Sequence, residues 1–195
     1  YDGSQHSFTN FALPGIDERH VGVEAGFKIP SGIPNLAVQG VLAYGQYYYT
    51  SNPKMYQTID NNASIVADTY GVTIPYWKSH PDLQGNTVRH YVESTPQLAV
   101  SAGLAWNWNY WFVDADVDYF ADSYLSMNPL YRTDYATAGP DRIVTPEEVV
   151  YMASQEKFDP AWLLNISIGK SWYIQRTYQL GFSLNAKNLL NNTWV

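Results

Sequence analysis

The chain has 195 residues, of which 46% are hydrophobic and 15% are charged. This composition is sufficient to bury a core and excludes an intrinsically disordered protein. Eleven Lys and Arg against 18 Asp and Glu give a formal charge of -7, so a basic surface that follows nucleic-acid phosphates is not expected. Cys is absent from the sequence, which excludes disulfides, thiolate zinc sites and cysteine nucleophiles.

The hydropathy of the chain excludes a helical membrane protein but leaves a membrane β-barrel open. No apolar run approaches the roughly 18 to 20 residues that a spanning helix requires. The strands of a barrel expose only alternate side chains to lipid, so their average hydropathy stays close to that of a soluble protein. Aromatic residues make up 16% of the chain, which is typical of interfaces, binding surfaces or membrane-boundary belts.

Six segments carry apolar residues at every second position, which is the period of a β-strand with two different faces. The clearest of them is the fourth, in which apolar residues alternate with Asp114, Asp116 and Asp118. One face of this strand is therefore expected to be apolar and the other acidic. The six segments cover residues 20–28, 35–49, 90–106, 111–120, 162–173 and 178–187.

The connections between these segments alternate between short and long. Three hold fewer than ten residues, whereas those at about 50–87 and 126–160 exceed thirty and are expected to be surface loops. Outer-membrane barrels show this alternation because their periplasmic turns are short and their extracellular loops are long, while soluble β-sandwiches do not follow it strictly.

The second long connection is expected to contain one short helix over residues 146–154. Thr145 is a favourable N-cap, Pro146 suits the first helical position and Glu148 suits the third.

Aromatic residues gather at both ends of the predicted strands. Ten residue steps separate Trp162 from Trp172, and a strand tilt of roughly 40° reduces this rise to about 25 Å, the height of a barrel's apolar band. Two aromatic girdles are therefore expected, and the alternative is that these rings fill the core of a soluble sandwich. The predicted girdle residues are Trp106, Trp108, Tyr110, Trp111, Tyr119, Tyr124, Trp162, Trp172 and Tyr178.

The acidic stripe is the first candidate site, because residues two apart on a strand share a face at about 7 Å. Asp114, Asp116 and Asp118 predict a patch in a barrel lumen that binds a cation or a polar solute. The alternative is that these acids pair with cations of a plug or of neighbouring strands, since barrel interiors are polar. The stripe lacks the glycine turn of a calcium loop, so no metal is assigned to it.

The second candidate site is Tyr131 with Arg132 in the second long connection, where an aromatic face and a bidentate donor suit contact with a ligand. A solvated surface is the alternative interpretation. The four histidines share no metal-like spacing, and no catalytic or phosphate-binding motif occurs in the sequence. We therefore expect neither enzyme activity nor a cofactor.

Three stretches resemble TonB-dependent receptors, particularly those of the Bacteroidota. The stretch LNISIGKSWYIQRTYQLGFSLNAKNLLNN (residues 164–192) looks like their late strands, and FALPGIDERHVGVEAGFKIP (11–30) and YFADSYLSMNPLYRTDYA (119–136) resemble the same group. The most specific element is residues 188–192, which are similar to the Asn-Leu-Phe-Asn-type motif that these receptors carry shortly before their last strand.

This resemblance implies an all-β, antiparallel transmembrane barrel of 22 strands, with an N-terminal plug domain. Residues 1–195 would be one partial barrel domain of about six up-and-down strands, by analogy strands 16 to 21, with two long extracellular loops. The plug, the earlier strands and the last strand would lie outside this sequence.

The resemblance also implies energised uptake of a scarce solute across the outer membrane of a Gram-negative bacterium. The expected partners are outer-membrane lipid, TonB with its inner-membrane motor acting through the plug and, as in some relatives, a surface lipoprotein. The alternative is a receptor-like barrel that serves as a structural subunit of a larger outer-membrane complex.

Overall fold

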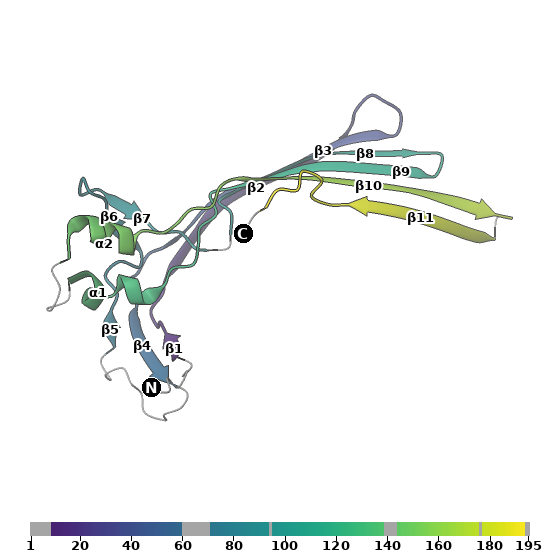
Figure 1. The fold of residues 1–195 in the computed structure, drawn as a ribbon. Helices are drawn as coiled ribbons and strands as arrows, with labels where there is room; N and C mark the ends of the chain where they lie inside the picture. Colours follow the sequence, from purple (N-terminus) through teal and green to yellow (C-terminus); the bar gives the residue numbers. More distant parts are fainter. Residues whose placement is uncertain (1–8, 60–70, 94, 139–143, 176, 194–195) are drawn as a thin grey trace. The chain divides into compact units, whose positions relative to one another are not determined.

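The structure, a computed structural model, describes residues 9–59, 71–93, 95–138, 144–175 and 177–193 (Figure 1). Antiparallel β-strands dominate it, as expected for an all-β chain. The contacts divide the chain into two compact units, which we call the sheet unit (Val21–Gln46, Ser94–Tyr124 and Lys157–Val195) and the loop unit (Tyr1–His20, Tyr47–Glu93 and Leu125–Glu156). The expected organisation as one partial barrel domain stays a prediction.

The sheet unit is built on a six-stranded sheet in the order β11-β10-β9-β8-β3-β2, in which strands adjacent in this list are hydrogen-bonded neighbours. Each predicted segment overlaps one of these strands. Their bounds are β2 (Glu18–Pro30), β3 (Leu36–Tyr49), β8 (Leu98–Trp108), β9 (Trp111–Ala121), β10 (Ala161–Ile174) and β11 (Tyr178–Ala186).

The predicted start of the third segment at residue 90 is wrong, because β8 begins at Leu98. Pro96 lacks the N–H that a strand ladder requires, which separates β8 from the preceding residues. Tyr91 forms an isolated bridge with Tyr48, and the Val92 amide donates to the Tyr47 carbonyl at 2.9 Å. Residues 91 and 92 therefore belong to the loop unit.

The chain reverses direction between β8 and β9 in a turn of two residues. Asn109 and Tyr110 have φ values of 47° and 64°, and Trp108 and Trp111 face each other across the hairpin. Positive φ at both central positions is the geometry of a tight hairpin turn whose twist matches that of its strands.

The two long connections form a structured unit rather than plain surface loops, which corrects the expectation. Tyr49, Met55, Ile74, Trp77 and Met127 are buried together, so residues from both connections share one hydrophobic core. Because this core is assembled from distant stretches of chain, its burial has no local sequence signature.

The elements of the loop unit are short, and residues 60–70 and 139–143 of the predicted loops lie outside the described residues. The predicted helix is confirmed as α2 (Pro146–Ala153), with Thr145 and Glu148 forming a capping box. None of the described helices has the length and apolar composition to cross a bilayer. The other elements are β1 (Thr9–Ala12), β4 (Lys54–Ile59), β5 (Val72–Thr73), β6 (Ser79–Pro81), β7 (Thr87–Arg89), a 3-10 helix η1 (Pro129–Arg132) and α1 (Asp134–Ala138).

Candidate functional site

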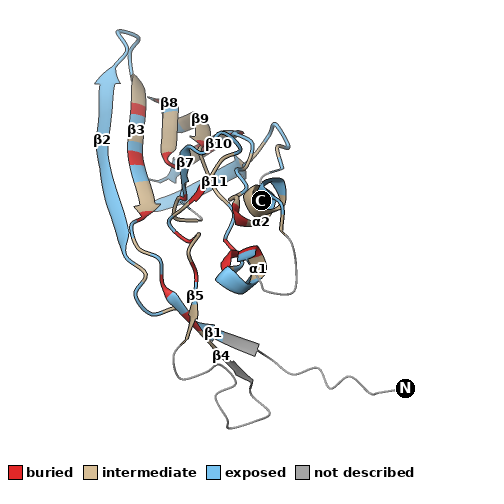
Figure 2. Cartoon of the chain, turned by 90° about the vertical axis from the view of Figure 1, so that its left-hand side faces the viewer, coloured by how far each residue is buried: buried red, intermediate tan, exposed pale blue. Residues whose placement is uncertain are grey.

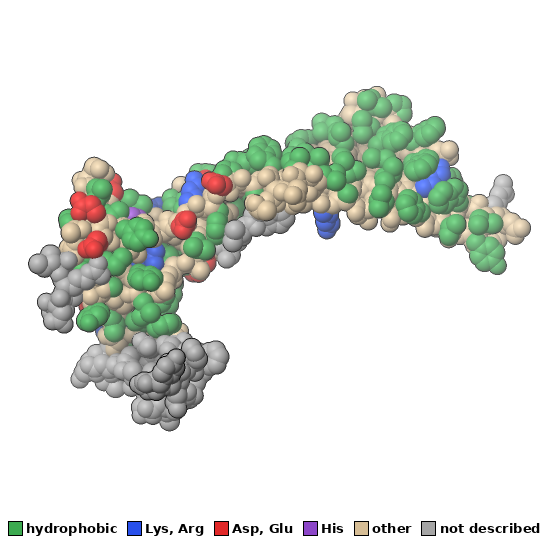
Figure 3. Space-filling model, in the orientation of Figure 1, with side chains coloured by type: hydrophobic (Ala, Val, Ile, Leu, Met, Phe, Trp, Pro, Cys, Tyr) green, Lys and Arg blue, Asp and Glu red, His purple; other side chains and the backbone are tan. Residues whose placement is uncertain are grey.

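One face of the sheet unit is apolar across five strands. Residues directly opposite each other in an antiparallel pair share a face, so the register gives the composition of each face. Figure 3 shows hydrophobic side chains gathered over these strands. The face consists of Leu36, Val38, Leu42 and Tyr44 (β3), Leu98, Val100, Ala102, Leu104, Trp106 and Trp108 (β8), Trp111, Val113, Ala115, Val117, Tyr119 and Ala121 (β9), Trp162, Leu164, Ile166, Ile168, Trp172 and Ile174 (β10), and Tyr178, Leu180, Phe182, Leu184 and Ala186 (β11), with Gly40 and Lys170 between them.

Apart from Ala121 at the end of β9, none of the apolar side chains of this apolar face is buried. Leu180 is 57% exposed, Phe182 55% and Leu184 58%. Val113 is half-buried and Val117 is exposed, although both lie in the middle of the sheet. These residues are therefore not the core of a sandwich formed by the described chain.

Seven of the nine predicted girdle residues lie on the apolar face. Tyr119 and Trp162 pair across β9 and β10 with ring centroids 4.4 Å apart, toward one end of the sheet. The other five gather toward the end that carries the tight turns, where Trp106 stacks on Trp108 at 6.1 Å. The remaining two residues are Tyr110, in the β8–β9 turn, and Tyr124, which bridges Lys157 outside the strands.

The opposite face carries the acidic stripe. The Asn165 side chain on β10 donates to Asp116 at 2.7 Å and to Asp118 at 3.0 Å, so a neutral amide rather than a cation links two of the acids. Asp114 lies opposite Ser167. Among the described residues no group of three or more His, Asp or Glu side chains is placed to hold a metal ion.

Asn165 also connects this polar face to the motif at residues 188–192. Its side-chain oxygen Oδ1 accepts the main-chain N–H of Asn188 at 3.1 Å, and Asn188 and Asn192 exchange two hydrogen bonds. The Asn192 side chain donates to the Trp162 carbonyl at 2.8 Å. Asn188 has a φ of 52°, a conformation that Asn tolerates better than most residues. The motif therefore ends β11 and ties the following residues to β10.

Replacing Asn165 with Ala removes three hydrogen bonds, two of them to carboxylates. We expect a loss of about 1 to 2 kcal/mol in unfolding free energy, because the site is only half-buried and water can satisfy part of the freed groups. Chemical denaturation of the purified full-length protein measures this loss. Asn185→Ala is the control, because its amide oxygen accepts one bond, from Ser167 at 2.6 Å. Equal losses in both variants contradict the bridging role of Asn165.

Tyr131 and Arg132 lie in the loop unit beside a hollow of about 430 Å³ that is also lined by Tyr151 and Glu156. Tyr131 is 56% exposed, whereas Arg132 is only 5% exposed. The Arg132 guanidinium donates to the carbonyls of Asn128, at 3.0 Å, and of Ser154, which caps the C-terminus of α2. Arg132 thus stabilises a helix end, and contact of these two residues with a solute stays a prediction.

Two histidines form a buried pair that the sequence spacing did not indicate. His80 Nδ1 and His90 Nε2 are 2.7 Å apart, and His90 Nδ1 is 2.8 Å from the Trp77 carbonyl oxygen. Burial lowers the pKa of His90 to about 4 and lowers that of His80. The β6–β7 hairpin brings His80 and His90, ten residues apart in the sequence, into contact. The contact can therefore be recognised only when the pairing of β6 with β7 is known.

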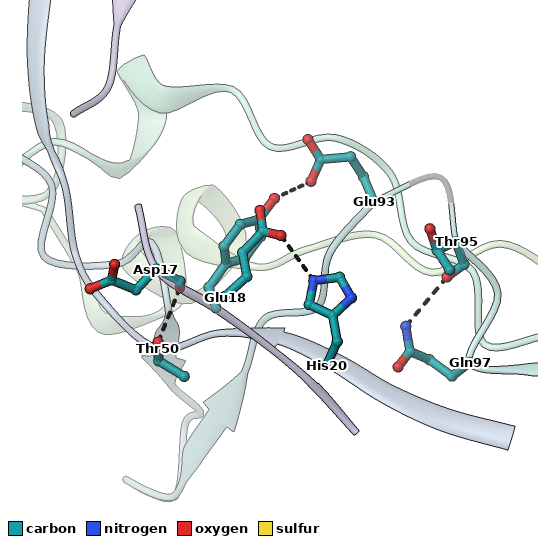
Figure 4. A network of polar contacts seen from close by, with 8 residues as sticks. Asp17, Glu18, His20, Thr50, Glu93, Thr95 and Gln97 are labelled. Carbon is teal, nitrogen blue, oxygen red and sulfur yellow. Dashed lines mark hydrogen bonds and ion pairs between the residues drawn. The ribbon is translucent and has the colours of Figure 1, made fainter. Parts of the chain in front are cut away.

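Further polar contacts surround the beginning of β2 (Figure 4). His20 Nε2 and the Glu18 carboxylate are hydrogen-bonded at 3.0 Å on the surface, and the Tyr49 hydroxyl donates to Glu93. The Thr50 hydroxyl donates to the Asp17 carbonyl at 3.1 Å. These contacts organise the loop unit and do not converge on a cavity.

Comparison of the chain with protein-family models, curated proteins and solved structures yields no match.

Proposed function

We propose that the sheet unit is a segment of a larger transmembrane β-barrel in the outer membrane of a Gram-negative bacterium, and that the whole protein is a TonB-dependent receptor for a scarce solute. The membrane location in this proposal is supported by the exposed apolar face of the sheet. The opposite face of the same sheet bears the acidic stripe together with Asn and Ser side chains. Lipid outside and a polar interior inside a barrel require this two-sided pattern.

The arrangement of residue types within the apolar face favours lipid over a second protein layer. Aliphatic side chains such as Val117 and Ile166 occupy its middle, and Trp and Tyr lie toward both ends of the strands. Aromatic rings with one polar atom are suited to the boundary between hydrocarbon and headgroups. A covering protein layer would not require this separation.

The two edges of the sheet support a continuation beyond six strands. β2 and β11 are the two ends of the strand order. All thirteen residues of β2 are exposed, and β11 is exposed along nearly its whole length. Figure 2 shows β2 in the pale blue of exposed residues. Unpaired strand edges cannot face hydrocarbon, because each unsatisfied N–H and C=O group costs several kcal/mol there. Further strands would pair with β2 and β11 and close the barrel.

Transport rests on the resemblance of residues 11–30, 119–136 and 164–192 to TonB-dependent receptors. In this proposal the acidic stripe lines the lumen, and the hollow beside Tyr131 and Arg132 contacts the solute from the extracellular side. Siderophores, vitamins, glycans and peptides are the solute classes to test.

Gene deletion combined with solute depletion tests the proposal. Wild-type and deletion strains grow in a defined medium containing ferric chelates, cobalamin, oligosaccharides and peptides, and mass spectrometry follows the loss of each solute. We expect slower depletion of one class, and the same defect when a protonophore dissipates the inner-membrane gradient. Unchanged depletion together with loss of a co-purifying complex would establish the structural-subunit alternative. Extraction of the full-length protein without detergent would exclude both.

A further inference from the structure

The hydrogen bonds of the paired histidines in the loop unit require a neutral His90 ring. A carbonyl oxygen only accepts, so the His90 Nδ1 that faces the Trp77 carbonyl carries the hydrogen. In a neutral imidazole the other nitrogen, His90 Nε2, is then an acceptor, and the hydrogen in the 2.7 Å contact comes from His80 Nδ1. The structure thereby assigns both tautomers.

A proton on His90 breaks this arrangement. The proton adds to Nε2, the only free lone pair of the ring, and places two N–H groups opposite each other across 2.7 Å. A proton on His80 adds to Nε2 and leaves the contact intact, but it introduces a charge into a buried site. Because His90 is 0% exposed and His80 is 6% exposed, water cannot solvate either charge without local opening.

The charged groups around the pair oppose protonation. The Arg132 guanidinium, buried in η1, lowers the pKa of both imidazoles, whereas Asp82 raises that of His80 by a smaller effect. Asp82 itself is held by the turn, where its carboxylate accepts from Gln84 and Asn86. In the described part of the chain neither imidazole is paired with a carboxylate.

The other charged residues of neighbouring elements are engaged elsewhere or exposed. Arg89 of β7 lies over the Tyr48 ring at 4.0 Å, and Glu93 accepts the Tyr49 hydroxyl. On α2, which contacts β6, Glu148 completes the capping box and Glu147 is exposed. Lys78, just before β6, is exposed. None of these groups offers a counter-charge to a protonated pair.

The pair links the β6–β7 hairpin to the core of the loop unit. His90 is hydrogen-bonded through its ring to Trp77, which is buried against Tyr49 with ring centroids 5.5 Å apart. The His90 carbonyl also accepts the Tyr49 amide at 3.2 Å. Loss of the imidazole contact therefore loosens the hairpin where it joins β3.

We propose that His80 and His90 form a proton-sensitive latch, which holds residues 76–92 on the core of the loop unit when both rings are neutral and releases them on protonation. This inference goes beyond the proposed uptake function, because it depends only on the loop unit.

The sign of the pH effect follows from the lowered pKa of His90. The open segment has the ordinary His value of 6.5, whereas the closed segment has a value of about 4. Between these values the open state binds more protons, so closure weakens as pH falls from 6.5 toward 4. At pH 5 the population of the open state is expected to be about 30-fold higher than above pH 7, since each pH unit below 6.5 contributes about tenfold.

Hydrogen–deuterium exchange of the full-length protein in detergent tests the latch at pH 7.5 and pH 5.0, after correction for the intrinsic exchange rate at each pH. We expect the opening constant of peptides covering residues 76–92 to rise about 30-fold. The double variant His80→Gln/His90→Gln keeps donors and acceptors but does not titrate, so its rise should be less than about threefold. His20→Gln, which removes an exposed histidine, should keep the full rise.

A rise below threefold in the wild-type protein overturns the latch, as does an equal rise in the double variant. If the double variant is open at both pH values, nitrogen NMR of histidine-labelled wild-type protein decides. A His90 ring that stays neutral down to pH 5 supports the latch, and a ring that is protonated at pH 6 overturns it.

Discussion

Replacing Leu184 with Arg is expected to destabilise the membrane-inserted protein by about 2 to 4 kcal/mol, the cost of a cation near the middle of a barrel's lipid face. Leu184 lies opposite Ile168, which is between Trp162 and Trp172 on β10. If this face were in contact with water, the same change would hardly alter the free energy of unfolding, because Leu184 is 58% exposed and its side chain makes few packing contacts. The size of the effect therefore reports the solvent that covers this face.

Ser183→Arg is the matched control, since it places the same charge one residue away on the polar face. We expect a loss of less than about 1 kcal/mol for this variant, because lumen positions are in contact with water. Guanidinium unfolding of the full-length protein in phospholipid vesicles measures both variants, and their abundance in the outer-membrane fraction should follow the same order. Equal costs for Leu184→Arg and Ser183→Arg would contradict a lipid-facing surface.

Gly169 is the second position where a single substitution should have a large effect. A Cβ atom added to Gly169 would lie 2.0 Å from Cζ of Phe112, whose ring covers the glycine from the neighbouring strand. An aromatic ring over a strand glycine is a known way to fill the gap left by the missing side chain. Gly169→Val must displace this ring, and we expect a loss of about 1 to 3 kcal/mol.

Gly181 on β11 provides the control, because its added Cβ would meet no atom closer than 3.8 Å. Gly181→Val should be neutral or stabilising, since Val suits a strand better than Gly. The double variant Gly169→Val/Phe112→Ala should be more stable than the sum of the two single changes predicts, because removal of the ring relieves the clash. Additive losses in this cycle would show that Phe112 does not limit the space above Gly169.

The strands of the sheet unit and helix α2 were predictable because each is encoded in neighbouring residues. Alternation around the acidic stripe defined β9, and Thr145 with Glu148 defined the start of α2. The start of β8 was placed too early, because the apolar alternation begins only at Leu98, where the pairing with β9 also begins, and residues 90–97 do not alternate.

The loop unit could not be derived from local patterns. Its core brings Met55 and Ile74 from one long connection against Met127 from the other, and no periodicity relates residues that far apart. Arg132 was identified as a candidate residue from its type. Its burial depends on the carbonyl groups of Asn128 and Ser154, which only the folded chain places around it.

The position of the acidic stripe could be predicted from the sequence, but its hydrogen bonds could not. Its common face follows from the two-residue period of β9, so the sequence was sufficient to place the three acids together. The bridge from Asn165 depends on the register between β9 and β10, which pairs Asn165 with Asp116. A register of this kind is fixed by contacts between distant strands and not by either strand alone.

The most direct test of the account is the environment of consecutive residues along β9 in the membrane-embedded full-length protein. This chain has no native Cys, so single Cys residues introduced at positions 113 to 118 carry nitroxide labels at defined sites. If this face contacts lipid, labels at 113, 115 and 117 collide mainly with oxygen dissolved in lipid, and labels at 114, 116 and 118 are less accessible to oxygen than these. Labels at 113, 115 and 117 that are shielded from both oxygen and a water-soluble nickel complex would place this face inside a protein core and contradict the account.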